Sequence, residues 1–228
     1  MVSDPSVLKE AAAAAALDRV RSGMKLGLGT GSTAAIFVRL LGERLRSGSL
    51  RDIVTVSTSV ATEKLARAEG ISCAALVDLK RLDLTVDGAD EIDDRLRLVK
   101  GRGGALLREK IVEQASDQFI VIADESKRVA RLGVGPFPVE VVPFATDLLL
   151  DRWRAEGIEV RLRRAGDAPF VTDEGNRIID VTVPATGDIA GFAASLRCQA
   201  GVVETGLFET EATEAFLAAA EGIIHMKK

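Results

Sequence analysis

The segment of residues 83–110 carries acids, a lysine and glycines at spacings that could support proton transfer. An apolar strand pattern leads into Asp87 and Asp90. A second strand pattern ends in Lys100 and a glycine-rich turn, and Glu109 follows on a predicted helix. Polar side chains that follow a strand tend to lie at the carboxyl edge of a sheet, where open α/β proteins bind ligands. There, lysine and free N–H groups can stabilise an oxyanion while a carboxylate takes a proton from carbon.

These charged residues have structural interpretations as well as a catalytic one. The acidic run consists of Asp87, Asp90, Glu91, Asp93 and Asp94. It could form a solvated turn or a divalent-metal site, but the EF-hand pattern fails and the spacing matches no other metal motif. In the third interpretation Asp87 and Asp90 accept hydrogen bonds from substrate hydroxyls and the later acids are exposed. For Glu109 and Lys110, the usual explanation is a charge pair on the helix surface.

Residues 24–34 have the layout of a phosphate-binding loop, in which a strand runs through a glycine turn into a helix. A P-loop would need a lysine that is absent here. A dinucleotide site would need an acid after the second strand, where the chain has hydroxyl residues at 57–59. The hydroxyls of Thr30, Ser32 and Thr33 suit a phosphate monoester better, with an empty glycine turn as the alternative. Together with the first segment and the lack of a cofactor motif, the loop indicates aldose–ketose chemistry on a sugar phosphate.

The composition excludes several classes of protein. The chain has 228 residues, 47% hydrophobic content and a net charge of −4, so we expect a folded globular protein without a nucleic-acid partner. His225 is the single histidine, which excludes histidine triads and histidine-rich metal sites by count. No apolar segment approaches the length of a membrane span, and the N-terminus lacks the order of a signal peptide. The lone cysteines Cys73 and Cys198 fit a reducing cytoplasm.

The predicted elements alternate in a way that positions these residues at one sheet edge. Up to about residue 130, strands alternate with helices, which predicts an α/β fold with a mainly parallel sheet and helices on both faces. After a linker at residues 133–138, the order β-α-β-β-α-β indicates a smaller ferredoxin-like α+β domain. We expect a helix at residues 211–220 and a strand at 222–225 to return to the first domain. The predicted domains are residues 1–132 with 207–228, and residues 133–206.

Six motifs in order resemble the A-type ribose-5-phosphate isomerase family almost from end to end. They lie at residues 27–34, 87–92, 100–110, 124–127, 138–143 and 201–208. The resemblance implies interconversion of ribose 5-phosphate and ribulose 5-phosphate through a cis-enediol, without metal or organic cofactor. It also implies a homodimer or homotetramer.

Matched by position, the family's catalytic roles go to three residues. Glu109 is the base that moves a proton between C1 and C2, Asp87 assists ring opening and proton movement among the oxygens, and Lys100 stabilises the enediolate oxygen. The implied substrate-binding positions are Lys9, Thr30, Gly31, Ser32, Thr33, Asp87, Gly88, Ala89, Asp90, Lys100, Gly101, Arg102, Gly103 and Lys127. Arg102 stands where the family often has a third consecutive glycine, which leaves open whether the backbone there needs a positive φ.

Other classes of protein with a related fold would contain different sequence features. A non-catalytic sugar-phosphate sensor of the repressor type should carry a helix-turn-helix first, yet only about 24 residues precede the first predicted strand. The presence of Glu109 also favours turnover. A sugar-phosphate deaminase would favour histidine in its acid–base machinery, and a CoA-transferase would need a nucleophilic glutamate in a different motif.

Overall fold

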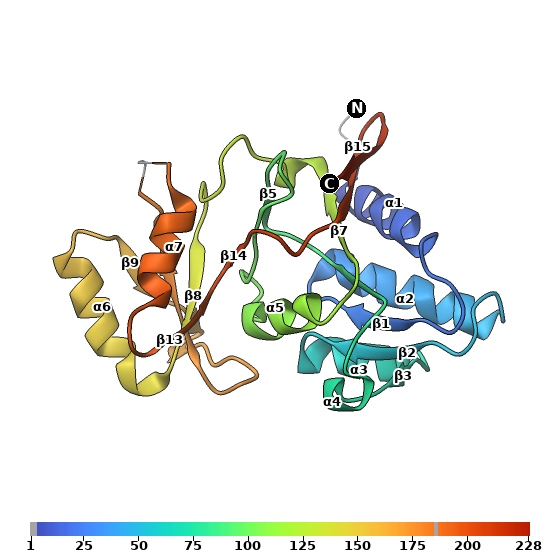
Figure 1. Ribbon diagram of the computed structural model, residues 1–228, viewed down its shortest axis with the longest axis horizontal. Helices are drawn as coiled ribbons and strands as arrows, with labels where there is room; N and C mark the ends of the chain where they lie inside the picture. The colour runs from blue at the N-terminus through green and yellow to red at the C-terminus, as the bar shows by residue number, and fades with distance from the viewer. Residues whose placement is uncertain (1–3, 185–186) are drawn as a thin grey trace.

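The computed structural model describes residues 4–184 and 187–228, which form two lobes joined by extended segments (Figure 1). The large lobe is built on a seven-stranded sheet of order β16-β15-β7-β4-β1-β2-β3. Every neighbouring pair in it is parallel except β15 and β16. The strands are β1 (Lys25–Leu28), β2 (Val54–Ser57), β3 (Ser72–Cys73), β4 (Leu84–Asp87), β7 (Phe119–Asp124), β15 (Glu214–Ala219) and β16 (Gly222–Lys227).

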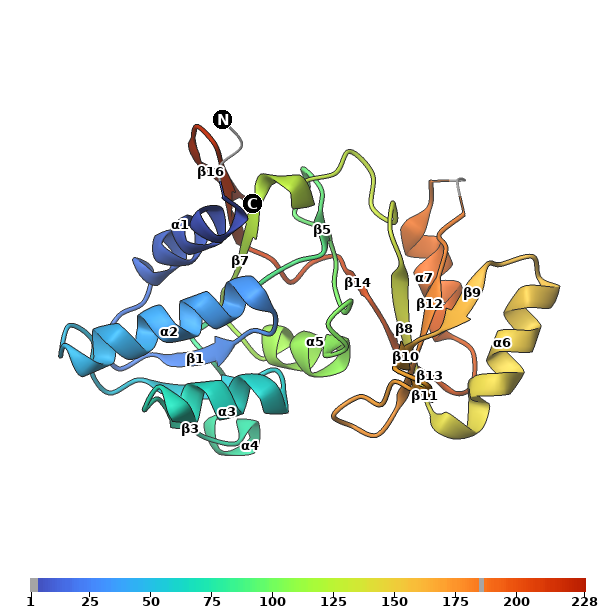
Figure 2. The same cartoon turned by 180° about the vertical axis from the view of Figure 1, so that it is seen from behind.

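Helices cover both faces of this sheet, as the sequence predicts. They are α1 (Pro5–Leu17), α2 (Ser32–Arg46), α3 (Val60–Ala68), α4 (Leu76–Leu79) and α5 (Leu106–Gln114). On β4, Leu84 and Val86 join the core formed with α1 and α2. Thr85 and Asp87 point to the opposite face, where α5 lies (Figures 1 and 2). Because both faces are covered, β4 is buried along its whole length, and strand alternation delivers Asp87 to the α5 side.

Two glycines of the first strand and its loop permit this packing. A Cβ on Gly27 would lie 1.8 Å from Thr85 Oγ1 and 2.7 Å from Val112 Cγ1 of α5. A Cβ on Gly29 would lie 2.1 Å from Asp87 Oδ1 and 2.5 Å from Asp87 Cα. The missing side chains therefore leave the space that α5 and the Asp87 carboxylate occupy.

We predict that Gly29→Ala destabilises the protein by about 1–3 kcal/mol, because the new methyl group must displace Asp87 and its backbone. Gly103→Ala is the matched control, since a Cβ there meets no atom within 4 Å and its φ is not positive. The control should change stability by less than about 0.5 kcal/mol. Urea unfolding of the three proteins measures both effects, and equal stability of Gly29→Ala and wild type would contradict the packing argument.

The small lobe has the ferredoxin-like topology that the sequence predicts. Its antiparallel sheet has the order β13-β8-β12-β9, with helices on one side (Figure 1). The elements in chain order are β8 (Phe137–Val141), α6 (Thr146–Ala155), β9 (Val160–Leu162), β12 (Arg177–Val181), α7 (Ile189–Arg197) and β13 (Val202–Thr205). A hairpin arm formed by β10 (Arg164–Ala165) and β11 (Ala168–Pro169) leaves this sheet between β9 and β12. The domain boundaries at 132/133 and 206/207 stay a prediction.

Short elements link the lobes and complete the site. A three-stranded sheet, β14-β6-β5, combines β5 (Glu91–Ile92), β6 (Leu98–Val99) and β14 (Leu207–Phe208). Two 3-10 turns, η1 (Glu125–Lys127) and η2 (Pro143–Ala145), follow β7 and β8. No helix in the described part of the chain is long and apolar enough to cross a membrane.

The helix predicted at residues 211–220 is wrong, because this segment contains strand β15. Ala215 and Leu217 pack into the core on the β6 side, while Phe216 and Ala218 pack into the core on the α1 side. β15 pairs with β7 on one edge and with β16 on the other. Tertiary pairing therefore overrides the helix preference of its alanines. The strand predicted at 222–225 is confirmed as β16.

Candidate active site

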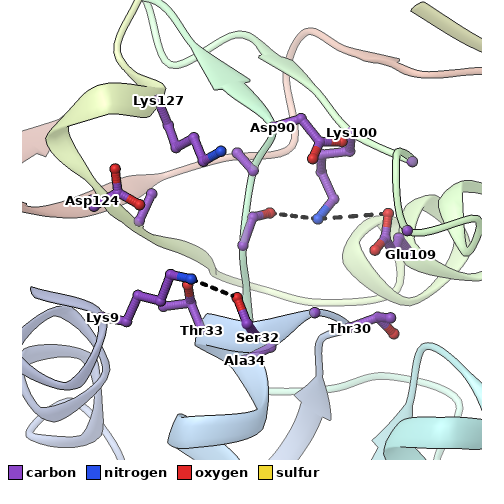
Figure 3. Close-up of a pocket in the computed structure, with 16 residues that line it drawn as sticks. Lys9, Thr30, Ser32, Thr33, Ala34, Asp90, Lys100, Glu109, Asp124 and Lys127 are labelled. Carbon is purple, nitrogen blue, oxygen red and sulfur yellow. Dashed lines mark hydrogen bonds and ion pairs between the residues drawn. The ribbon is translucent and has the colours of Figure 1, made fainter. Parts of the chain in front are cut away.

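A cavity of about 180 Å³ opens at the carboxyl ends of β1, β4 and β7, beside the start of α2 and the turn before α5 (Figure 3). Most of the predicted site residues line it. The lining residues are Lys9, Thr30, Gly31, Ser32, Thr33, Ala34, Gly88, Ala89, Asp90, Lys100, Gly101, Gly103, Glu109, Ala123, Asp124 and Lys127. Asp87 and Arg102 are predicted site residues that do not line it. Ala34, Ala123 and Asp124 line it without having been predicted.

One end of the cavity is suited to an anion. Gly31, with a φ of 113°, is the N-cap of α2 and makes no side-chain capping bond, so the N–H groups of the first turn face the cavity end. Lys9 of α1 donates to Ser32 Oγ at 3.0 Å, and Lys127 approaches from the opposite side (Figure 3). A helix N-terminus flanked by two lysines attracts negative charge, as a phosphate group requires.

Thr30 contributes to this loop differently from the expectation based on its hydroxyl. Its Oγ1 lies 2.7 Å from Thr58 Oγ1 and 2.9 Å from Ser59 Oγ, within a cluster of hydroxyls behind the loop. Figure 3 shows the side chain pointing away from Lys100 and Lys127. Its backbone N–H donates to Asp87 Oδ1 at 2.9 Å, so Thr30 fixes the loop against β4.

The other end of the cavity is formed by a buried lysine among carboxylates. Lys100 Nζ lies 2.9 Å from Asp87 Oδ2, 3.4 Å from Glu113 Oε1 and 3.7 Å from Glu109 Oε2. It also donates to the carbonyl oxygen of Gly88 at 2.6 Å (Figure 3). The lysine and all three carboxylates are at least 95% buried. One cation thus stands against three acids in a region with little water.

Burial and charge shift the pKa values of this cluster strongly. Burial raises the pKa of Glu109 to about 8, with Lys100 opposing the shift and the neighbouring acids adding to it. Burial also raises the pKa of Asp87 and of Glu113 against the pull of Lys100. For Lys100, burial lowers the pKa, but the three carboxylates outweigh burial and raise it above its usual range. The lysine therefore stays charged, while Glu109 titrates near neutral pH, as a general base should.

The turn that follows Lys100 brings backbone groups to the cavity. Gly101 and Gly104 have φ values of 99° and 87°, whereas Arg102 does not have a positive φ. A positive φ is therefore needed at Gly101 and Gly104 and not at Arg102, so the arginine fits this turn. The Arg102 N–H donates to Asp90 Oδ2 at 2.8 Å. Its guanidinium points away from the cavity, pairing with Glu91 and reaching the carbonyl oxygen of Pro136 at 3.2 Å.

The expectation that the later acids of the run are exposed is wrong for Glu91 and Asp93. Glu91 is 1% exposed, and its carboxylate accepts the N–H groups of Gly133 at 2.6 Å and Gly135 at 2.8 Å in addition to pairing with Arg102. Asp93 is 5% exposed and accepts the N–H of Arg97 at 2.9 Å. These acids fold the chain around the site, and Asp94 alone in this later group is exposed.

The surface-pair explanation for Glu109 and Lys110 is also wrong, because both side chains are buried. Glu109 faces Lys100, whereas Lys110 Nζ donates to the carbonyl oxygens of Thr205 at 2.9 Å and Leu207 at 2.7 Å. Adjacent helical residues point in different directions, so one serves the cavity and the other ties α5 to the segment leaving the small lobe.

Glu113 and Arg163 also contribute to the site but are not among the residues predicted from the sequence. Glu113 follows Glu109 by four residues, so the two share a face of α5, and this spacing could have revealed it. Arg163 contacts the glycine turn from the small lobe, and no local pattern marks it. Within the described residues, no group of three or more histidine, cysteine or acidic side chains is arranged to hold a metal ion.

Comparisons with known proteins agree with this geometry. The family model described as ribose 5-phosphate isomerase A (phosphoriboisomerase A) matches residues 54–222. The chain is 52% identical over 203 residues to the ribose-5-phosphate isomerase A of Sphingopyxis alaskensis, covering 89% of this chain and 88% of that protein. It is also 52% identical over 228 residues to that of Rhodopseudomonas palustris BisB5, covering 96% and 97%.

Solved structures of the family superpose along nearly the whole chain. A D-ribose-5-phosphate isomerase in complex with phospho-erythronic acid gives a TM-score of 0.94 at 38% identity, covering 99% of this chain and 100% of that one. The ribose 5-phosphate isomerase of Plasmodium falciparum gives 0.93 at 35% identity, covering 98% and 99%. These matches confirm the resemblance seen in the six motifs, and the chain belongs to the ribose 5-phosphate isomerase A family.

Proposed function

We propose that this protein is a ribose-5-phosphate isomerase, which interconverts D-ribose 5-phosphate and D-ribulose 5-phosphate through an enediol in the non-oxidative branch of the pentose phosphate pathway. The observation that carries the proposal is the placement of Glu109 and Lys100 3.7 Å apart on the wall of a cavity whose far end suits a phosphate. A carboxylate base and a fixed cation on one side of an open-chain sugar are what an enediol reaction needs.

The phosphate of the substrate fixes the sugar in this scheme. It binds at the N-terminus of α2 between Lys9 and Lys127, which leaves the carbonyl end to extend toward Lys100. Asp90, held by the Arg102 N–H, accepts hydrogen bonds from substrate hydroxyls. Binding energy from the phosphate thus positions C1 and C2 against the base.

Proton transfer then runs through Glu109. In its ionised form Glu109 removes the proton from C2 of the open-chain aldose, and the electron pair moves to form the C1–C2 double bond while O1 becomes negative. Lys100 and the backbone of Gly101 and Gly103 stabilise this oxygen. Glu109 returns the proton to C1, and the O2 hydroxyl proton passes to O1, giving the ketose. Asp87 does not line the cavity, so we assign its part in moving oxygen protons to its contact with Lys100.

A coupled assay of the purified protein with ribose 5-phosphate tests the proposal, with glucosamine 6-phosphate as the second substrate. Formation of ribulose 5-phosphate, undiminished by a chelator, is the expected result. Ammonia release from glucosamine 6-phosphate would instead favour the deaminase alternative. Binding of ribose 5-phosphate without turnover would favour a non-catalytic sensor.

We further propose that the protein works in the cytoplasm as a homodimer or homotetramer. The support is the family resemblance together with the lone cysteines, which suit a reducing compartment. Sedimentation equilibrium of the purified protein measures the oligomer, and a monomer at micromolar concentration would refute that part.

The pH dependence follows from the raised pKa of Glu109. We predict that kcat/KM for ribose 5-phosphate rises with pH through about 8 and then levels off, because the base works only when ionised and its pKa is about 8. In Glu109→Asp the carboxylate lies farther from C2 of the substrate, so kcat/KM should fall, but it should still rise with pH. A wild-type profile that is flat between pH 6 and 9 would contradict this role.

A further inference from the structure

We propose that Arg163, which lies in the small lobe, is a positioning residue for the isomerase site. It holds two peptide planes of the glycine turn so that their N–H groups face Asp90 and the cavity. The inference rests on the proposed function, which it deepens by assigning part of the site to the second lobe.

The contacts of Arg163 join the two lobes at the turn. Its Nη1 donates to the carbonyl oxygens of Gly101 at 2.7 Å and Arg102 at 3.0 Å. Its Nε donates to Asp180 Oδ2 of β12 at 3.0 Å, and its Nη2 pairs with the other oxygen of the same carboxylate. The two side chains are 12% exposed each. A guanidinium held by a bidentate carboxylate keeps its remaining donors in a fixed direction.

Peptide geometry converts these two contacts into the orientation of two donors. In a trans peptide the C=O and the following N–H point in opposite directions. With the Gly101 carbonyl directed at Arg163, the Arg102 N–H points the other way, to Asp90 Oδ2 at 2.8 Å. With the Arg102 carbonyl also directed at Arg163, the N–H of Gly103 points away from the small lobe, and Gly103 lines the cavity.

The segment that continues from Arg163, which comprises the hairpin arm and residues 170–174 after it, is itself anchored to the large lobe. A Cβ on Gly104 would lie 2.4 Å from Phe170 Cζ, so the Phe170 ring packs directly on the end of the turn. Asp173 accepts the N–H of Val60, the first residue of α3, at 2.8 Å, and Arg108 of α5 pairs with Glu174. These contacts therefore hold Arg163 at a fixed distance from the turn. The glycines of the turn are conformationally permissive and do not fix its backbone by themselves.

Loss of Arg163 should act mainly on the transition state. Donors that meet charge as it develops on O1 matter more for kcat than for substrate binding. We therefore expect Arg163→Ala to lower kcat by about 100-fold, as a misplaced site group does, with a smaller change in KM. The pH at which activity rises should stay close to that of the wild type, because burial is the main cause of the raised pKa of Glu109, and Lys100, which opposes the shift, makes no contact with Arg163.

The test compares Arg163→Ala with Arg164→Ala in the isomerisation of ribose 5-phosphate, with folding checked by thermal unfolding. Arg164 is the neighbouring exposed arginine, and its guanidinium contacts only the carbonyl of Asp167 among the bonds described for it. Arg164→Ala should keep wild-type kcat. Added guanidinium ion should restore part of the activity of Arg163→Ala, because it can occupy the vacated space beside Asp180, and should not restore Glu109→Gln.

A second variant covers the case in which Arg163→Ala leaves Asp180 unpaired and fails to fold. Arg163→Met with Asp180→Leu removes the pair without stranding a charge. A folded variant of either kind with kcat within threefold of wild type overturns the inference. Lower kcat at unchanged stability supports it. Absence of turnover by the wild type itself overturns the proposed function and this inference together, so the two failures are distinguishable.

Discussion

Glu109→Gln is expected to lower kcat by about 100- to 10,000-fold, the usual contribution of a general base, while the affinity for sugar phosphate stays nearly the same. The amide cannot take a proton from C2, but it preserves the volume of a side chain that is 4% exposed on α5. The phosphate contacts lie at the other end of the cavity, at α2 and the two lysines. Steady-state kinetics and calorimetric titration with a non-isomerisable sugar phosphate measure the two effects.

Glu113→Gln is the matched comparison for this variant. Both glutamates are buried on the same face of α5 and lie near Lys100, but only Glu109 lines the cavity. If Glu109 acts through proton transfer, its substitution should be far more harmful than that of Glu113. Equal losses in the two variants would mean that both act only through the charge of Lys100, and the base would have to be another group.

Lys100→Met should cost both catalysis and stability. Loss of the charged donor at the enediolate oxygen is expected to lower kcat by about 100- to 1,000-fold. The same change removes the only ammonium beside Asp87, Glu109 and Glu113 in the described structure and should destabilise the fold by about 3–5 kcal/mol, as breaking a buried ion pair does.

The loss of stability in Lys100→Met should depend on pH. The pKa of Glu109 is raised from 4.5 to about 8, so its contribution to stability is fully present below pH 4.5 and is lost as the pH rises through about 8. Without Lys100 the acids are harder still to ionise, and the stability deficit should grow between pH 6 and pH 9. Urea unfolding at both pH values measures this. Lys127→Met, at a partly exposed lysine, serves as the control and should weaken substrate affinity with little change in stability.

The large features of the fold could be predicted because they depend on local patterns. The strand pattern before Asp87 and the glycine turn before α2 identify a sheet edge without any knowledge of distant residues. The alternation of strands and helices gives the parallel sheet in the same way. The ferredoxin-like order of the small lobe follows from its element sequence alone.

The wrong or missing predictions concern residues whose environment depends on distant parts of the chain. Residues 211–220 look helical by composition, and only pairing with β7 makes them a strand. Glu91 looks solvated among acids, yet it caps the N–H groups of a loop more than forty positions later. Arg163 lies about sixty positions from the turn it supports. No window of sequence contains both members of these pairs.

The pairing of β15 with β7 also bears on how the chain is made. Residues 120–124 of β7 meet residues 214–218 of β15, so the sheet that carries the site gains this neighbour only after more than ninety further positions of the chain have been synthesised. The small-lobe elements, from β8 to β13, are all complete before that point and need no later residue for their own sheet. Domains fold as units during translation, and contacts of high sequence separation form late. On the ribosome, the small lobe and its hairpin arm can therefore be folded before β15 pairs with β7 and completes the catalytic sheet.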